Sequence, residues 1–89
     1  MNSIIRTTSF KKQYKKLSSI DKELVKEVIL LLAENEELNE KYKDHKLTGN
    51  FKDLKECHVK PDLLLIYKIN DDVLELALVH VGNHNSLFK

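Results

Sequence analysis

The feature that most constrains the fold of this chain is the apolar run LLLIYKI at residues 63–69. Apolar side chains occupy both odd and even positions of the run, so a strand formed there would bury both of its faces. The sequence PD before the run and the sequence NDD after it are turn-forming. The run therefore predicts the central strand of a sheet, with a neighbouring strand on each side of it in the sequence.

Residues 55–60, KECHVK, have the pattern of the strand before that run. Successive side chains of a strand point to opposite faces, so we expect Cys57 and Val59 to face the core. Residues 73–81 predict the strand after the run, which ends at Gly82. The exposed face of the 55–60 strand is then expected to carry Glu56, His58 and Lys60.

The first third of the chain has the spacing of two helices that follow a short strand at residues 4–5. Thr8 or Ser9 is expected to cap the first helix. Ser18 begins a capping box for the second, which is expected to end near Asn35. The apolar positions are Phe10, Tyr14 and Leu17 in the first helix and Leu24, Val25, Val28, Ile29, Leu31 and Leu32 in the second.

Taken in order, these elements predict an α+β fold of one domain, residues 1–89. A chain of 89 residues can bury one modest core, so two layers of secondary structure are expected. We expect a small, twisted, mainly antiparallel sheet packed against an N-terminal antiparallel helical hairpin, in the order β-α-α-β-β-β. Residues 35–50 show no sustained period and predict a long loop, which in a compact domain is often functional.

The composition indicates a globular protein of a reducing compartment. The single cysteine excludes an internal disulfide, and no apolar run reaches the ~18 residues that cross a bilayer. Residues 1–17 hold five basic and no acidic side chains, and residues 41–60 hold six lysines against three acids. These two segments could form a surface for a polyanion; a solvated lysine face is the alternative.

The four histidines are the side chains most suited to chemistry. His58 is expected on the exposed face of its strand, where it has no packing role. His45 lies in the long loop, and His80 and His84 lie around the end of the third strand. Imidazole exchanges protons near neutral pH, and a carboxylate such as Asp62 can orient it or act as a base. These groups could cleave RNA without a metal, whereas histidines scattered over the surface are the alternative from the residues alone.

A metal site and a cysteine nucleophile are less favoured. The chain has no C-x-x-C pair, and His80 and His84 straddle a strand end rather than share one helical face. Cys57 and His58 are adjacent in a strand, so their side chains should point in opposite directions. Cys57 itself has the pattern of a small buried apolar residue. We therefore expect no metal and no cofactor.

Two segments resemble a known family. YKDHKLTGNFKDLKECHVKPDLLLIY, which begins at Tyr42, and VGNHNSLF, which ends at Phe88, resemble the YafQ-type branch of the RelE/ParE toxin superfamily. Members of that branch are ribosome-associated mRNA interferases of bacterial type II toxin–antitoxin modules. The resemblance covers about half of the chain in three separated motifs. The RelE-like fold that it implies has the element order expected above.

The resemblance implies a site and a set of partners. It implies that His45, His58, Asp62 and His84 are catalytic. It also implies a metal-independent endoribonuclease that acts in the cytoplasm on mRNA in the ribosomal A site, beside ribosomal RNA, and that has a cognate antitoxin as partner. Phe88 matches a near-terminal aromatic that the resemblance implies supports the mRNA; the alternative is that such a residue simply fastens the tail to the core. The residues expected to bind RNA or stabilise charge are Lys46, Lys55, Lys60, His80 and Phe88.

Three positions depart from the family pattern. His80 and Lys55 stand where arginines are usual, and Asn83 stands where a serine is usual. Arginine holds a phosphate with two donors, whereas histidine offers one and titrates, so we expect weaker transition-state stabilisation. The alternative function is a ParE-like or catalytically silent toxin that acts through gyrase or only binds its antitoxin. ParE-type members generally lack the histidine set, which favours the nuclease.

Overall fold

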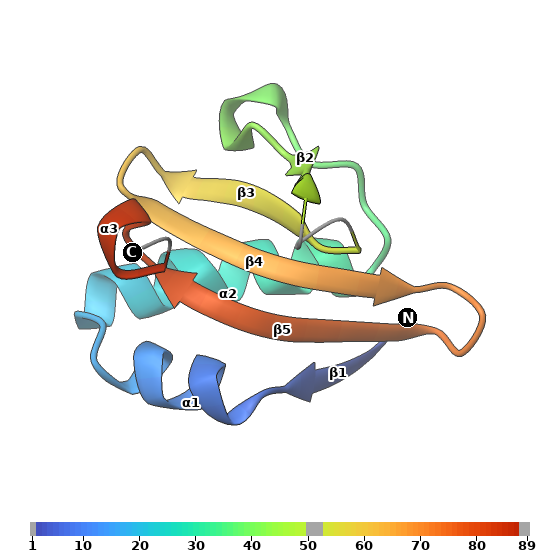
Figure 1. Ribbon diagram of the computed structural model, residues 1–89, viewed down its shortest axis with the longest axis horizontal. Coiled ribbons are helices and arrows are strands. Elements are labelled where there is room, and N and C mark those ends of the chain that lie inside the picture. Colours follow the sequence, from blue (N-terminus) through green and yellow to red (C-terminus); the bar gives the residue numbers. More distant parts are fainter. Residues whose placement is uncertain (1, 50–52, 88–89) are drawn as a thin grey trace.

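The computed structural model describes residues 2–49 and 53–87, which form one five-stranded sheet with helices (Figure 1). The elements are β1 (Ser3–Arg6), α1 (Thr8–Lys15), α2 (Ser19–Ala33), the 3-10 helix η1 (Glu40–Tyr42), β2 (His45–Lys46), β3 (Lys55–Lys60), β4 (Leu63–Asn70), β5 (Glu75–Gly82) and α3 (His84–Leu87). The strand order is β1-β5-β4-β3-β2. Among these strands β1 and β5 pair in parallel and the other neighbours pair antiparallel, which confirms the predicted α+β class.

Strand β4 lies at the centre of the sheet because both of its faces are apolar. Leu65 and Tyr67 belong to the main core. Leu64 and Ile66 are also buried, but alternation along the strand places them on its opposite side. β3 and β5 flank β4 as antiparallel neighbours. The central strand predicted at residues 63–69 is therefore confirmed.

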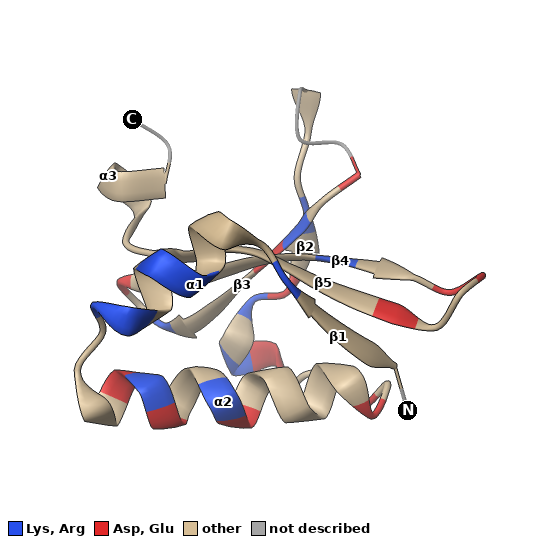
Figure 2. Cartoon of the chain, turned by 90° about the horizontal axis from the view of Figure 1, so that it is seen from below, with Lys and Arg blue, Asp and Glu red and all other residues tan. Residues whose placement is uncertain are grey.

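Helix α2 covers one face of the sheet, and α3 lies on the other side (Figure 2). As predicted, Ser18 caps α2: its Oγ accepts the backbone N–H of Asp21 over 3.1 Å. The side chains of α2 that face the sheet, among them Val25 and Val28, are buried against β4 and its neighbours. Within residues 2–49 and 53–87, no helix is long and apolar enough to cross a membrane.

Helix α1 lies along the part of β5 that β1 leaves unpaired. β1 pairs with β5 only as far as Leu78. Beyond that point Thr7 Oγ1 donates to the carbonyl oxygen of Val79 over 2.8 Å. The backbone N–H of Val81 donates to Gln13 Oε1 over 2.9 Å. Side chains around α1 thus take the place of a strand along this edge, whose backbone groups would otherwise need other partners.

The structure corrects two local expectations for element boundaries and adds detail to a third. Thr7, rather than Thr8 or Ser9, caps α1, because its Oγ1 accepts a backbone N–H one turn along. β5 begins at Glu75, two residues later than predicted, since Leu74 adopts a left-handed backbone with φ of 52°. The predicted long loop contains the short elements η1 and β2.

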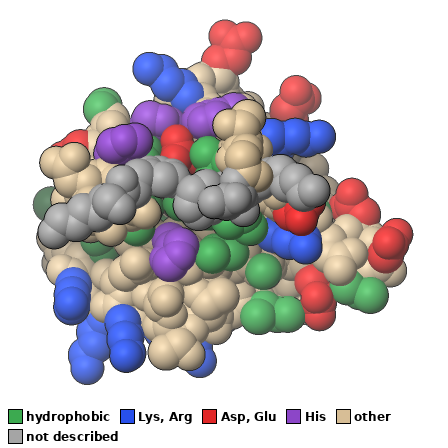
Figure 3. Space-filling view, viewed as in Figure 1, with side chains coloured by type: hydrophobic (Ala, Val, Ile, Leu, Met, Phe, Trp, Pro, Cys, Tyr) green, Lys and Arg blue, Asp and Glu red, His purple; other side chains and the backbone are tan. Residues whose placement is uncertain are grey.

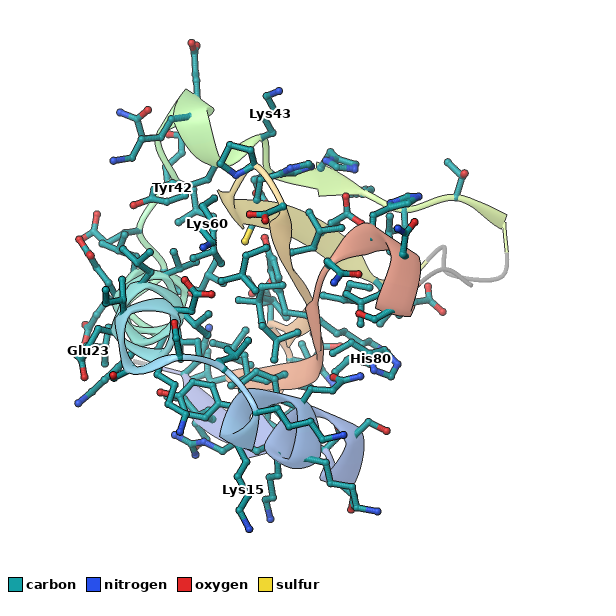
Figure 4. All side chains as sticks on the ribbon, turned by 90° about the vertical axis from the view of Figure 1, so that its left-hand side faces the viewer. Lys15, Glu23, Tyr42, Lys43, Lys60 and His80 are labelled. Atoms are coloured by element: carbon teal, nitrogen blue, oxygen red, sulfur yellow. The ribbon has the colours of Figure 1, made fainter. Side chains whose placement is uncertain are left out.

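Lys60 lies on the core side of the sheet, so its predicted position on the exposed face is wrong. The register of β3 against β4 shifts between His58 and Lys60, and Lys60 pairs with Leu63, a core residue. The Nζ atom of Lys60 lies 2.9 Å from Oδ1 of Asp21 on α2. Figure 4 shows Lys60 between β3 and α2. Strict alternation fails here because Val59 is the extra residue of a β-bulge.

We expect Leu65→Ala to lower the free energy of unfolding by about 2–5 kcal/mol, because Leu65 is completely buried and its truncation leaves a cavity. Ile20→Ala is the matched control. Ile20 is 74% exposed, so its truncation should change stability by less than about 0.5 kcal/mol. Urea denaturation of both variants measures the difference, and equal losses would contradict the position of the core.

Candidate active site

Two imidazoles converge on one carboxylate on the face of the sheet that α2 does not cover. The Nε2 atoms of His45 and His58 lie 3.4 Å and 3.5 Å from Oε1 of Glu56. The two ring centroids are 6.3 Å apart. Figure 3 shows histidine side chains gathered on this face. We call His45, Glu56 and His58 the histidine–carboxylate cluster.

The pairing of β2 with β3 produces this cluster. His45 pairs directly with Glu56 across the two strands, which brings their side chains together on one face. Glu56 and His58 are two residues apart on β3, so they share that face as well. The predicted outward orientation of His58, opposite the buried Cys57, is confirmed.

The carboxylate of Glu56 has lost most of its contact with water. Its side chain is 8% exposed, and its ion-pair partners among the described residues are the two imidazoles of the cluster. A buried carboxylate without a compensating positive charge is strongly destabilising. The two imidazoles are therefore the described groups placed to compensate the carboxylate of Glu56.

His45 has a hydrogen-bond acceptor at each ring nitrogen. Its Nδ1 lies 2.7 Å from the carbonyl oxygen of Lys43, so Nδ1 carries a hydrogen and donates it. Its Nε2 faces the carboxylate of Glu56. The Lys43 carbonyl therefore fixes the orientation of the His45 ring and holds Nε2 on the side of the cluster.

Asp44 attaches the chain just before His45 to the core. The hydroxyl of Tyr67 donates to Oδ1 of Asp44, and Lys55 Nζ lies 2.9 Å from Oδ2. Burial, and then the hydrogen bond to Asp44, raise the pKa of the Tyr67 phenol well above its usual value. Lys55 Nζ also lies 5.8 Å from the centre of the Tyr67 ring. Two strands of the sheet thus hold Asp44, which positions the neighbouring His45.

Asp62 and His84 lie at one end of the sheet, beside the row that carries His58. His58 of β3 pairs with Leu64 of β4, and Leu64 pairs with Gly82 of β5, so these three residues form one row across the sheet. A Cβ at Gly82 would lie 2.8 Å from a serine Oγ of α3, so α3 folds closely over this position. α3 begins at His84, and the exposed Asp62 lies in the β3–β4 turn at the same end of the sheet (Figure 1). The fold thus brings His45 and His58 to one carboxylate and places Asp62 and His84 near the other end of β3, and the catalytic role of the four residues stays a prediction.

His80 lies on the same face but outside the cluster. Glu56 pairs with Ile66, and Ile66 pairs with His80, so His80 is in the same row two strands away from Glu56. Its Nδ1 lies 3.2 Å from Nε2 of Gln13. Figure 4 shows His80 pointing outward beside α1, away from α2.

The lysines predicted to stabilise charge lie on the other side of the sheet. Lys55 and Lys60 are paired with aspartates there. Lys46 follows His45 in β2, so its side chain points the opposite way, into a groove of about 920 Å³. Acidic side chains outnumber basic ones among the residues that line this groove, which does not suit a polyanion. RNA binding by these lysines stays a prediction, and Phe88 lies outside the described residues.

Cys57 is not part of the site. Burial, and then the nearby charges of Asp44 and Glu56, raise the pKa of its thiol to about 12. A thiol that stays protonated is a poor nucleophile and a poor metal ligand. In the described part of the chain, no three His, Cys, Asp or Glu side chains are placed to share a metal ion.

Sequence reasoning missed the residues that hold the histidines. Glu56 was expected on the exposed face, but no role was assigned to it. The available signal was its position two residues before an outward histidine on the same strand. Asp44 and Tyr67 are 23 positions apart, so their contact depends on tertiary structure and leaves no local pattern.

A twisted sheet with a helix on one face and acid–base residues on the other defines the class of small RelE-like bacterial toxins. Within that class, this chain belongs to the YafQ family. The family model described as "Bacterial toxin of type II toxin-antitoxin system, YafQ" matches residues 2–89. The resemblance inferred from the motifs is confirmed.

Individual proteins that are similar to this chain in sequence or structure include members of the same family. The curated "mRNA interferase toxin YafQ" of Escherichia coli K12 is 45% identical over 47 residues, which are 53% of this chain and 49% of that protein. The chain thus matches about half the length of its curated relatives. A crystal structure of a metal-bound toxin from Helicobacter pylori is 40% identical, with a TM-score of 0.87 over 99% of this chain and 100% of that one. The matched chain in the crystal structure of the E. coli DinJ–YafQ complex is 31% identical to this chain. The TM-score is 0.84, and the match covers 100% of this chain and 100% of that one.

We expect Tyr67→Phe to lower the free energy of unfolding by about 1.5–3 kcal/mol, because it removes a buried hydrogen bond to the carboxylate of Asp44. Tyr42→Phe is the matched control, since the Tyr42 hydroxyl forms no such bond with residues 2–49 or 53–87. Urea denaturation compares the two variants. A loss for Tyr67→Phe no larger than that of the control would contradict the role of this contact.

The Cys57 thiol should react with a thiol reagent far more slowly in the folded protein than in urea at about pH 8. Burial raises its pKa from the usual value of 9.0 to about 12 in the folded state. The thiol therefore adds stability that is fully present below about pH 9 and is lost as the pH rises above it. Cys57→Ala should lose less stability than wild type between about pH 9 and 11. Rapid labelling of the folded protein would contradict the burial.

Proposed function

We propose that the protein is the toxin of a type II toxin–antitoxin system and cleaves mRNA by acid–base catalysis. The observation that carries this proposal is the histidine–carboxylate cluster, in which two imidazoles share one buried carboxylate on an open face of the sheet. Relatives that match about half of the chain are named mRNA interferase toxins. The proposed reaction uses side chains alone and needs no cofactor.

Cleavage of RNA begins when a base removes the proton of a 2′-hydroxyl. The 2′-oxygen then attacks the adjacent phosphorus, the bond to the 5′-oxygen breaks, and the leaving oxygen takes up a proton from an acid. The products are a 2′,3′-cyclic phosphate and a 5′-hydroxyl. The site must therefore supply a proton acceptor, a proton donor and positive charge near the phosphate.

The geometry of the cluster supports a division of these roles. His45, which the Lys43 carbonyl holds beside Glu56, helps to position the phosphate. His58, oriented by Glu56, or Asp62 then removes the 2′-proton. His84 protonates the leaving 5′-oxygen.

A basic surface on α1 supports contact with ribosomal RNA. Lys11, Lys12, Lys15 and Lys16 are all exposed, and Figure 2 shows basic residues along α1, whereas acidic and basic residues alternate along α2. Each phosphate contact releases counterions, so binding to the ribosome should weaken steeply with salt. We place the substrate mRNA in the ribosomal A site, and hence the action of the toxin in the cytoplasm.

We also propose that a protein antitoxin binds this chain. The E. coli YafQ relative was solved in complex with DinJ, and its fold matches this one over the whole chain. A partner of that kind would have to block access to the histidine face or to the ribosome-binding surface in order to neutralise the toxin.

Ribosome-dependent mRNA cleavage is the deciding experiment. In a translation reaction, mRNA cleavage by primer extension should fall by about 10²–10⁴-fold in His58→Ala and in His84→Ala. Glu23→Gln is the control, because Glu23 is exposed on α2, on the opposite side of the molecule from His80 (Figure 4). It should cleave as wild type does.

Two further arms separate the alternatives. EDTA should leave cleavage unchanged, and loss of cleavage would indicate a metal-dependent nuclease instead. Inhibition of gyrase supercoiling with intact mRNA would indicate a ParE-like toxin. If wild type and His84→Ala leave growth and mRNA equally intact in cells without antitoxin, the nuclease proposal is rejected.

A further inference from the structure

We propose that Gln13 is a positioning residue that fixes His80 as a neutral hydrogen-bond donor for a phosphate oxygen of the bound RNA. The two side chains meet although they are 67 positions apart, one on α1 and the other on β5. The inference rests on the proposed cleavage of RNA, but it concerns a pair outside the histidine–carboxylate cluster.

The backbone of β5 determines which way round the Gln13 amide lies. The N–H of Val81 can only donate, and it lies 2.9 Å from Oε1 of Gln13. With the amide reversed, its NH2 group would face another N–H group, so the carbonyl oxygen must point to Val81. The NH2 group then points to Nδ1 of His80, 3.2 Å away.

The orientation of the amide in turn determines the tautomer of His80. Because the NH2 group of Gln13 donates, Nδ1 of His80 must accept with its lone pair. The hydrogen of the neutral ring therefore lies on Nε2. A hydrogen on Nδ1 would set two N–H groups against each other, so the contact selects the tautomer whose hydrogen lies on Nε2.

His80 presents this Nε2–H group on the histidine face. Its row in the sheet continues through Ile66 to Glu56, and at a strand spacing of ~4.8 Å the backbones of His80 and Glu56 are roughly 10 Å apart. One RNA strand can therefore extend from His80 to the histidine–carboxylate cluster. A neutral donor binds a phosphate oxygen without releasing a counterion, so this contact adds little to the salt dependence of binding.

Gln13→Glu tests the tautomer directly. A glutamate keeps an acceptor for the Val81 N–H but places a second acceptor at Nδ1, so Nδ1 should now carry a hydrogen. Imidazole 15N NMR at about pH 8.5, where an ordinary histidine is neutral, reads the position of the hydrogen. We expect Nε2–H in wild type, Nδ1–H in Gln13→Glu and a mixture in Gln13→Ala.

Ser9→Glu is the control for this experiment, because it adds the same charge one turn earlier on the exposed surface of α1 and should keep the wild-type pattern. An Nδ1–H ring in wild type would overturn the proposal, and so would the same tautomer in wild type and Gln13→Glu.

Binding to RNA tests the second half of the proposal. Ribosomes are programmed with an mRNA whose A-site codon carries 2′-O-methyl groups, so that binding is measured without cleavage. At a pH at which the 15N spectrum reports a neutral ring in both variants, Gln13→Glu should bind about tenfold more weakly than Ser9→Glu, because the lone pair of Nε2 then faces the phosphate. Equal affinities would reject the phosphate contact even if the tautomer changes. A wild type that binds but does not cleave unmodified mRNA would reject the proposed nuclease while leaving this comparison decisive.

Discussion

Burial of both faces of β4 is the constraint on which the rest of the structure depends. Leu65 and Tyr67 pack on the α2 side, and Leu64 and Ile66 are buried on the other. A strand with two apolar faces is stable only between two neighbours, so β3 and β5 must flank it. That placement carries the polar side chains of β3 and β5 to one face, which α2 leaves open. The candidate site therefore follows from the packing of the core rather than from an element added to it.

The site has little fixed positive charge, and this links its electrostatics to its chemistry. The lysines nearest to it in the sequence point to the other side of the sheet, where carboxylates hold two of them. The ion-pair partners of Glu56 among the described residues are His45 and His58, the groups that would also exchange protons in the proposed reaction. Without these imidazoles the buried carboxylate would lose its partners, so the proposed chemistry and the local stability depend on the same side chains.

Patterns that depend only on backbone geometry could be predicted from the sequence. The alternation of β3 placed Cys57 inward and His58 outward, and the two-sided run placed β4 at the centre. Lys60 was misplaced because a bulge adds one residue to a strand without changing its composition. The contacts of Glu56 and Gln13 could not be predicted, since each depends on a partner from a distant segment. The catalytic set itself came from a family resemblance, because isolated histidines have no spacing that distinguishes a site from an ordinary surface.

The part of β5 that β1 leaves unpaired determines how Gln13 lies beside His80. β1 is too short to pair with the end of β5, so a side chain of α1 must accept the N–H of Val81. A carboxylate would satisfy that N–H equally well, but an amide also carries a donor, and the donor sets the tautomer of the adjacent imidazole. An arginine at position 80, as in the family pattern, would need no such partner because a guanidinium has donors only. Gln13 and His80 therefore act as one unit in the proposal. Gln13 accepts the backbone N–H of Val81, and the same amide determines which ring nitrogen of His80 carries the hydrogen.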